Sequence, residues 1–149
     1  MSAGPFRRGR RLFSTAAALL ILVAAAHTAG IARLLFPTEP LPRVFGAMAA
    51  ERTPMGMGME PSVLDISLAV SLTMSVTLAA LGLLNLVVAA AADTGAATLR
   101  RLAWLDAAWV GALVALYAHY RIPPPLVSTA LVEVVLLANL VTTARDTPA

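Results

Sequence analysis

The chain has no cysteine and no lysine, few aromatic residues and few charged ones. Without cysteine it can form no disulfide framework, no thiolate metal site and no cysteine nucleophile. Aromatic residues make up 5% of the sequence and no basic stripe is interleaved with them, which argues against a nucleic-acid surface. A phosphate-binding glycine loop, a nucleophile elbow, a paired-histidine metal motif and an internal repeat are also missing from the sequence. The sequence therefore carries no catalytic signature.

Hydrophobic residues are abundant: they make up 59% of the sequence, and the mean hydropathy is +0.81. Soluble domains are nearer to half apolar. The longest apolar run covers residues 67–92 and contains no ionisable side chain. Because about 20 apolar residues suffice to cross a bilayer, this run predicts a transmembrane helix.

Three further runs have the same character, and prolines or charged residues separate them. Lipid-exposed spans must satisfy their backbone hydrogen bonds internally, so each is predicted as a helix. The 149 residues are enough for one domain. We therefore predict an all-α integral membrane fold, an antiparallel four-helix transmembrane bundle. Its spans cover about residues 12–36, 67–92, 102–120 and 126–143, with an outer loop at about 37–66.

Small residues on the third span indicate how the helices pack. Ala103, Ala107, Gly111 and Ala115 recur every fourth residue, and His119 continues the same ridge. Small side chains let two helices approach closely in a bilayer. The ridge therefore predicts a tight helix contact, with the large Leu and Val side chains turned toward lipid.

All eleven basic residues are arginines, and they are unevenly distributed. Seven lie at the N-terminus, between the second and third spans, or at the C-terminus, whereas the four others fall on the opposite side. Because cytoplasmic loops are richer in arginine and lysine, we expect both termini in the cytoplasm and the protein in the cell (inner) membrane. The outer loop is then expected to hold a short interfacial helix over Arg43 to Arg52.

The opening stretch RRGRRLFSTAAALLILVAAAHTAG also resembles a secretory signal, even one of the twin-arginine type. Its apolar character continues through Phe36, beyond the roughly 7 to 15 residues usual in a signal. This length favours a retained first span over a cleaved one.

Ionisable groups within a span cost roughly 2.5 to 3.5 kcal/mol at the bilayer centre, so each is a site hypothesis. Glu133 is the deepest, and Thr129 lies one turn earlier on the same face. We expect Glu133 to be protonated. It is either a proton-handling or ligand-binding acid, or a structural group that is hydrogen-bonded to a neighbouring helix.

Other polar residues fall near the outer ends of the spans. We expect one outward-facing pocket on which Glu133 converges with His27, Asp65, Tyr117, His119 and Tyr120. The alternative for His27 is a neutral imidazole bonded to a facing side chain. Asp65 is equally explained as an acid that caps the start of its helix.

Three polar residues lie deeper or nearer the inner boundary. Asp106 is expected to form an interfacial ion pair with Arg100, Arg101 or the N-terminal arginines. Asn85 and Asn139 are interpreted as hydrogen-bonding residues between helices.

The outer loop contains Met55, Met57 and Met59 in the sequence MGMGM. Thioethers suit Cu(I), which makes a copper site one reading. The other is an adaptable apolar strip over the membrane or the bundle. With no cysteine or histidine in the loop, we expect no metal and no cofactor.

Three stretches suggest a family resemblance: AAHTAG around His27, EPSVLDISLAVSLTMSVTLAALGLL from Glu60, and YAHYRIPPPLVSTALVEVVLLA from Tyr117. The chain resembles a family of small bacterial four-span membrane proteins that has no established activity. The resemblance implies a four-helix integral membrane fold and no particular chemistry.

We expect a non-enzymatic membrane protein, either a bundle that binds lipid or a small hydrophobic ligand or an accessory subunit of a membrane complex. Its expected partners are the bilayer, a hydrophobic small molecule or another membrane protein, and not nucleic acid. The alternative is a membrane enzyme acting on a hydrophobic substrate, with His27 and Glu133 as an acid–base pair. That enzyme requires both groups within reach of one substrate atom.

Overall fold

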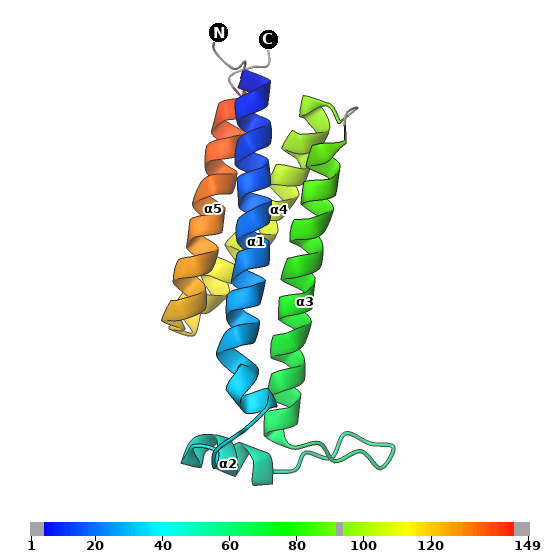
Figure 1. Cartoon of the computed structure of the whole chain (residues 1–149), viewed down its shortest axis with the longest axis vertical. Helices are drawn as coiled ribbons and strands as arrows, with labels where there is room; N and C mark the ends of the chain where they lie inside the picture. Colours follow the sequence, from blue (N-terminus) through cyan, green and yellow to red (C-terminus); the bar gives the residue numbers. More distant parts are fainter. Residues whose placement is uncertain (1–4, 92–93, 145–149) are drawn as a thin grey trace. The chain divides into compact units, whose positions relative to one another are not determined.

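The computed structural model describes residues 5–91 and 94–144, and these residues form five helices and no strand. The helices, shown in Figure 1, are α1 (Pro5–Leu35), α2 (Arg43–Ala50), α3 (Val63–Ala90), α4 (Ala96–His119) and α5 (Pro123–Ala144). α1, α3, α4 and α5 are each long and apolar enough to cross a membrane. This confirms the prediction of an all-α fold with four such helices.

The helices extend beyond the apolar runs that predicted them. α1 begins at Pro5, ahead of the apolar run that starts at Leu12, and so includes the N-terminal arginines. Arginine is a good helix former, so the helix has no reason to stop where the hydrophobicity does. α5 begins at Pro123, within the run of prolines that was expected to form the turn, because proline is tolerated in the first turn of a helix.

The predicted short helix in the loop is present as α2, none of whose residues is buried. After α2 the chain forms a narrow hairpin. Arg52 and Ser62 make an isolated antiparallel bridge, and Thr53 N–H donates to Pro61 O at 3.0 Å. The hairpin leads directly into α3.

The chain divides into two compact units. The first contains α1 up to Val23, α3 from Leu78, and all of α4 and α5. The second is Ala24–Thr77, which includes α2, the hairpin and the remaining parts of α1 and α3.

In the first unit, α1 contacts both α3 and α5 through glycines. A Cβ on Gly82 of α3 would lie 2.6 Å from Ala17 O and 2.7 Å from Ile21 Cγ1 of α1, so the two backbones meet closely there. On the other side, Asn139 of α5 donates a hydrogen bond from Nδ2 to the carbonyl oxygen of Gly9 in α1.

α4 completes this unit through polar contacts. Asn85 Nδ2 of α3 donates to Asp106 Oδ2 of α4 at 2.7 Å. A Cβ on Gly111 of α4 would lie 3.6 Å from Glu133 Oε1 of α5, and α4 and α5 lie side by side (Figure 1). The four pairwise contacts therefore link α1, α3, α4 and α5 in a closed ring.

The buried face of α4 holds large residues such as Leu99 and Val110 beside small ones, so the large Leu and Val side chains are turned outward only in part. Ala103 and Ala107 are buried, whereas Trp104 and Leu105 are 58% and 67% exposed. The predicted ridge is thus buried over its first half only, because Ala115 and His119, further along it, are exposed. Outward-facing large apolar residues are the arrangement expected of helices in contact with lipid.

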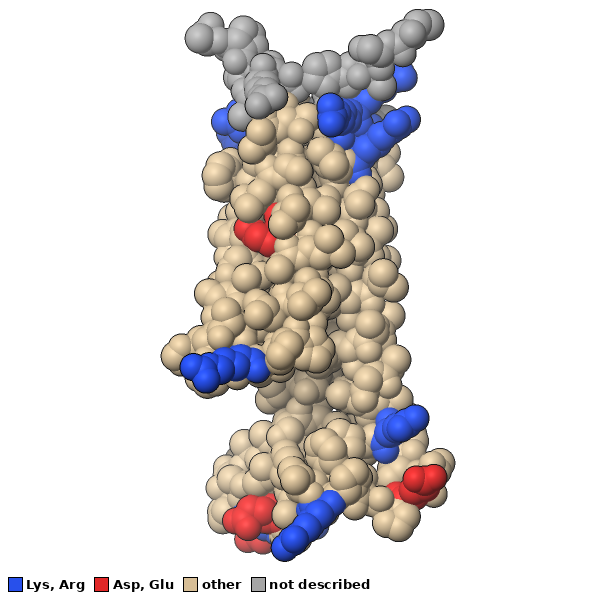
Figure 2. Space-filling view, turned by 90° about the vertical axis from the view of Figure 1, so that its left-hand side faces the viewer, with Lys and Arg blue, Asp and Glu red and all other residues tan. Residues whose placement is uncertain are grey.

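Arginines gather at one end of the first unit. Arg10 donates a 3.3 Å hydrogen bond to Ala91 O, just beyond α3, which places the start of α1 beside the end of α3. Figure 2 shows several blue arginine side chains gathered at this end, and the tan surface beyond it carries few charged side chains.

Candidate functional site

Glu133 lies near the middle of α5. Its side chain is half-buried against α4, near Gly111, and its Oε2 is fully buried without a hydrogen-bond partner. An unpaired buried polar atom is uncommon, because it has lost its hydrogen bonds to water without replacement. Among the described residues, Glu133 is therefore the acid whose carboxyl group has a buried oxygen atom without a hydrogen-bond partner.

Thr129 lies one turn before Glu133 and is 1% exposed. Its hydroxyl donates to Pro125 O at 2.7 Å, in its own helix, and not to the Glu133 carboxyl group. Such bonds to the carbonyl four residues earlier are the usual solution for threonine in a helix. Thr129 therefore does not satisfy Glu133.

Tyr117 and His119 lie near the end of α4 but differ in exposure. Tyr117 is 8% exposed, whereas His119 is exposed and its ring meets that of Tyr120 edge-on, with centroids 4.9 Å apart. Residues two apart on a helix point in nearly opposite directions. The two side chains are therefore presented to different surroundings.

His27 and Asp65 belong to the second unit. His27 is half-buried on α1, and its Nε2 is buried with no hydrogen-bond partner in the described structure. Since the other predicted site residues lie in the first unit, their convergence with His27 and Asp65 on one pocket stays a prediction.

Asp65 has a well-defined structural role. Its Oδ2 accepts hydrogen bonds from the Ser62 N–H at 3.0 Å and the Ser62 hydroxyl at 2.7 Å, and its own N–H donates to Ser62 Oγ at 3.0 Å. This reciprocal pattern is a capping box, which satisfies backbone donors at the start of a helix. The helix-capping interpretation of Asp65 therefore has direct geometric support.

The methionine loop forms the tip of the hairpin. Met55 N–H donates to Met59 O at 3.0 Å, so these two residues lie opposite each other. Gly56, Met57 and Gly58 have φ angles of 82°, 52° and 76°, a left-handed stretch that favours glycine at its ends. All three methionine side chains are exposed, and copper binding at this tip stays a prediction.

Asp106 has a different partner from the one predicted. It is 4% exposed and accepts a hydrogen bond from Asn85, and the described residues provide it with no ion pair. The prediction that Asp106 forms an ion pair with the arginines is therefore wrong. The helical stretch from Arg100 to Asp106 carries the carboxyl group more than one turn into the bundle, where Asn85 of α3 faces it.

Asn139 has the predicted role in part. It bonds Gly9 across helices through Nδ2, while its Oδ1 is buried without a partner. No group of three or more His, Cys, Asp or Glu side chains that suits a metal ion is present in the described part of the chain.

No protein-family model, curated protein or solved structure gives a significant match to the chain. The resemblance to four-span bacterial membrane proteins therefore stays a prediction.

Proposed function

We propose that the protein is a multi-pass integral membrane protein of the cell membrane. In this proposal α1, α3, α4 and α5 cross the bilayer as an antiparallel bundle, with both termini in the cytoplasm. The protein acts without catalysis, either by binding lipid or a small hydrophobic ligand or as an accessory subunit of a membrane complex.

The observation that carries the proposal is the sorting of side chains in the first unit. Polar groups such as Asn85, Asp106 and Asn139 are buried and bond between helices, whereas large apolar side chains such as Leu105 and Val134 are exposed. Water would make that exposure unfavourable, but hydrocarbon does not. The arginine-rich end supports a cytoplasmic placement, because arginines concentrate there in membrane proteins.

The experiment has two parts. Membranes that contain the expressed protein are washed with alkaline carbonate, and we expect the protein to remain in the pellet with an integral membrane marker. Protein purified in mild detergent is then extracted with organic solvent, and we expect mass spectrometry to find a lipid or hydrophobic small molecule at stoichiometric amounts. Release by carbonate would overturn membrane integration; retention without any bound amphiphile would leave the accessory-subunit role as the function.

A further inference from the structure

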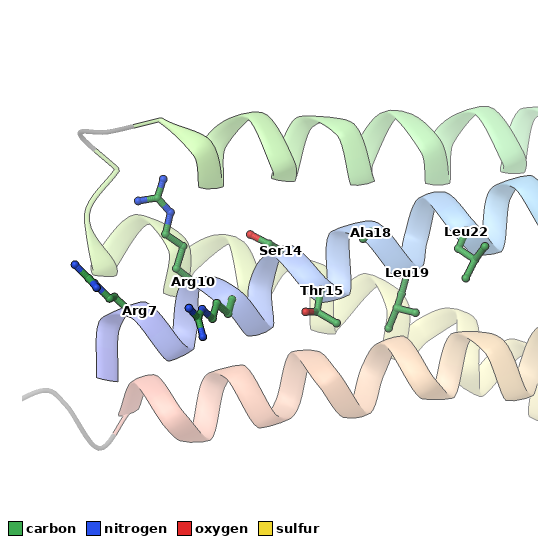
Figure 3. Close-up of a pocket in the computed structure, with 8 residues that line it drawn as sticks. Arg7, Arg10, Ser14, Thr15, Ala18, Leu19 and Leu22 are labelled. Atoms are coloured by element: carbon green, nitrogen blue, oxygen red, sulfur yellow. The ribbon is translucent and has the colours of Figure 1, made fainter. Parts of the chain in front are cut away.

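A shallow groove runs along the outward face of α1 in the first unit, with a volume of about 750 Å³. It is basic and polar at one end and apolar at the other (Figure 3). The lining residues, in order along the helix, are Arg7, Arg10, Arg11, Ser14, Thr15, Ala18, Leu19 and Leu22.

The groove lies on the face of α1 opposite its packed face. Phe13, Ala16 and Leu20 are each 1% exposed, whereas Thr15 and Ala18 are exposed and Leu22 is 62% exposed. The exposed groove residues therefore contribute little to the packing of the unit and are available to a partner, and the half-buried ones, such as Ser14 and Leu19, keep part of their surface accessible.

The cations at the head of the groove are positioned but not neutralised. Arg10 is held by its 3.3 Å hydrogen bond to Ala91 O. Arg7 and Arg11 are exposed and have no hydrogen bond or ion pair with any described residue. Guanidinium groups bind phosphate through two parallel hydrogen bonds, and the hydroxyl groups of Ser14 and Thr15 supply further donors beside them.

We propose that this groove binds an anionic phospholipid. The arginines hold the phosphate, the two hydroxyl groups lie at the level of the glycerol backbone, and one acyl chain covers Ala18, Leu19 and Leu22. The inference rests on the proposed membrane placement and names the ligand class for it.

The length of the groove and the position of its arginines at one end both favour a lipid over a soluble anion. The seven residue-to-residue steps of helix from Thr15 to Leu22 rise about 10 Å, comparable with the hydrocarbon depth of one leaflet, about 15 Å. An inorganic phosphate would use only the arginine end. Basic clusters at the cytoplasmic ends of transmembrane helices are a recognised kind of anionic-lipid site.

The test uses native mass spectrometry of the full chain in detergent, titrated with palmitoyl-oleoyl-phosphatidylglycerol or with the phosphatidylcholine of the same chains. We expect tighter binding of phosphatidylglycerol. The variant Arg7→Gln/Arg11→Gln should lose about 30-fold in affinity for it, since each arginine near an anionic lipid contributes roughly a factor of five. Arg10 is left unchanged because it also contacts the end of α3.

The matched control is Arg8→Gln/Arg101→Gln, which removes the same charge from exposed positions that do not line the groove. We expect it to lose less than about threefold, because charges acting through solvent are screened. A second pair tests the apolar end: Ala18→Trp should obstruct the acyl chain, whereas Ala108→Trp, at an exposed position on α4, should not.

Equal binding of the two lipids, or equal losses in the groove and control variants, would overturn the proposal. Competition by glycerophosphate at the same concentration as the lipid would also overturn it, because the head alone would then suffice. None of these results affects whether the protein stays in the membrane during the carbonate wash. Failure of the lipid site can therefore be distinguished from failure of membrane integration. Size-exclusion profiles matching the native protein establish that the variants fold.

Discussion

Asn85 and Asp106 form a hydrogen bond of 2.7 Å between α3 and α4, with side chains that are only 2% and 4% exposed. The bond joins two helices through side chains that are both buried. Polar contacts of this kind hold membrane helices together where no hydrophobic driving force acts between them.

The first prediction concerns this pair. Asp106→Leu leaves the Asn85 amide buried without an acceptor, so we expect it to lower stability in detergent by about 1 to 3 kcal/mol. Asp106→Asn retains an acceptor oxygen and should lower it by less. The measurement is thermal unfolding of the purified variants.

A double-mutant cycle provides the control. Asn85→Leu/Asp106→Leu removes both polar groups, and we expect it to be more stable than the sum of the single losses predicts, by about 0.6 to 1.7 kcal/mol. Strict additivity of the two single variants would show that the pair does not interact in solution.

The sequence was sufficient for some levels of structure and not for others. Hydrophobic length identified the four long helices, and the proline-bounded loop identified α2, because these features depend only on local composition. The partner of Asp106 was not predicted, because the arginines close to it in sequence are not its neighbours in space. α4 carries Asp106 inward, and Asn85 comes from a different helix.

Some features of the candidate site could likewise be predicted from the sequence, and others could not. The capping role of Asp65 was legible because it involves Ser62, three residues away. The groove on α1 was not predicted, because the same arginines were fully explained as topology determinants. Their helical spacing with Thr15 and Leu22, which places them on one face, was the signal available in the sequence.

The second prediction compares two glycines. Gly82→Ala puts a Cβ within 2.6 Å of a backbone oxygen of α1, which cannot move without shifting the helix. We expect a loss of about 1 to 3 kcal/mol in stability. Gly111→Ala meets the Glu133 side chain at an ordinary 3.6 Å and should change stability by less than about 0.5 kcal/mol.

Thermal unfolding of the two glycine variants side by side makes this measurement. The reverse order, with Gly111→Ala the more damaging, would show that α1 and α3 do not approach as closely as the structure has them.

The third prediction tests the cap of α3. Asp65→Ala removes the acceptor for the Ser62 N–H and hydroxyl, and we expect a loss of about 0.5 to 2 kcal/mol. Asp65→Asn keeps an acceptor oxygen and should recover much of it. Hydrogen exchange of the first-turn amides of α3 would report the fraying, and exchange as slow in Asp65→Ala as in the native protein would contradict the cap.

The fourth prediction concerns orientation, and the absence of native cysteine makes it simple to test. Single cysteines are placed at Thr38 and Met59, in the segments that flank α2, and at Gly95, before α4. In intact cells, an impermeant thiol reagent should label Thr38→Cys and Met59→Cys and spare Gly95→Cys. Permeabilised cells should give labelling at all three. The opposite pattern in intact cells would reverse the proposed topology.

The fifth prediction concerns Glu133, whose carboxyl group makes no hydrogen bond in the described structure. Removing it therefore leaves no protein group without a partner, unlike the removal of Asp106. We expect Glu133→Leu to be at least as stable in detergent as Glu133→Gln. Leucine, unlike glutamine, buries no polar side-chain atom without a partner. Unfolding of both variants beside Asp106→Leu provides the comparison. If Glu133→Leu instead loses as much stability as Asp106→Leu, the carboxyl group has a structural partner in the membrane. If it is stable, the bundle gains nothing from this acid, and a role toward a ligand or a neighbouring membrane protein becomes the explanation to pursue.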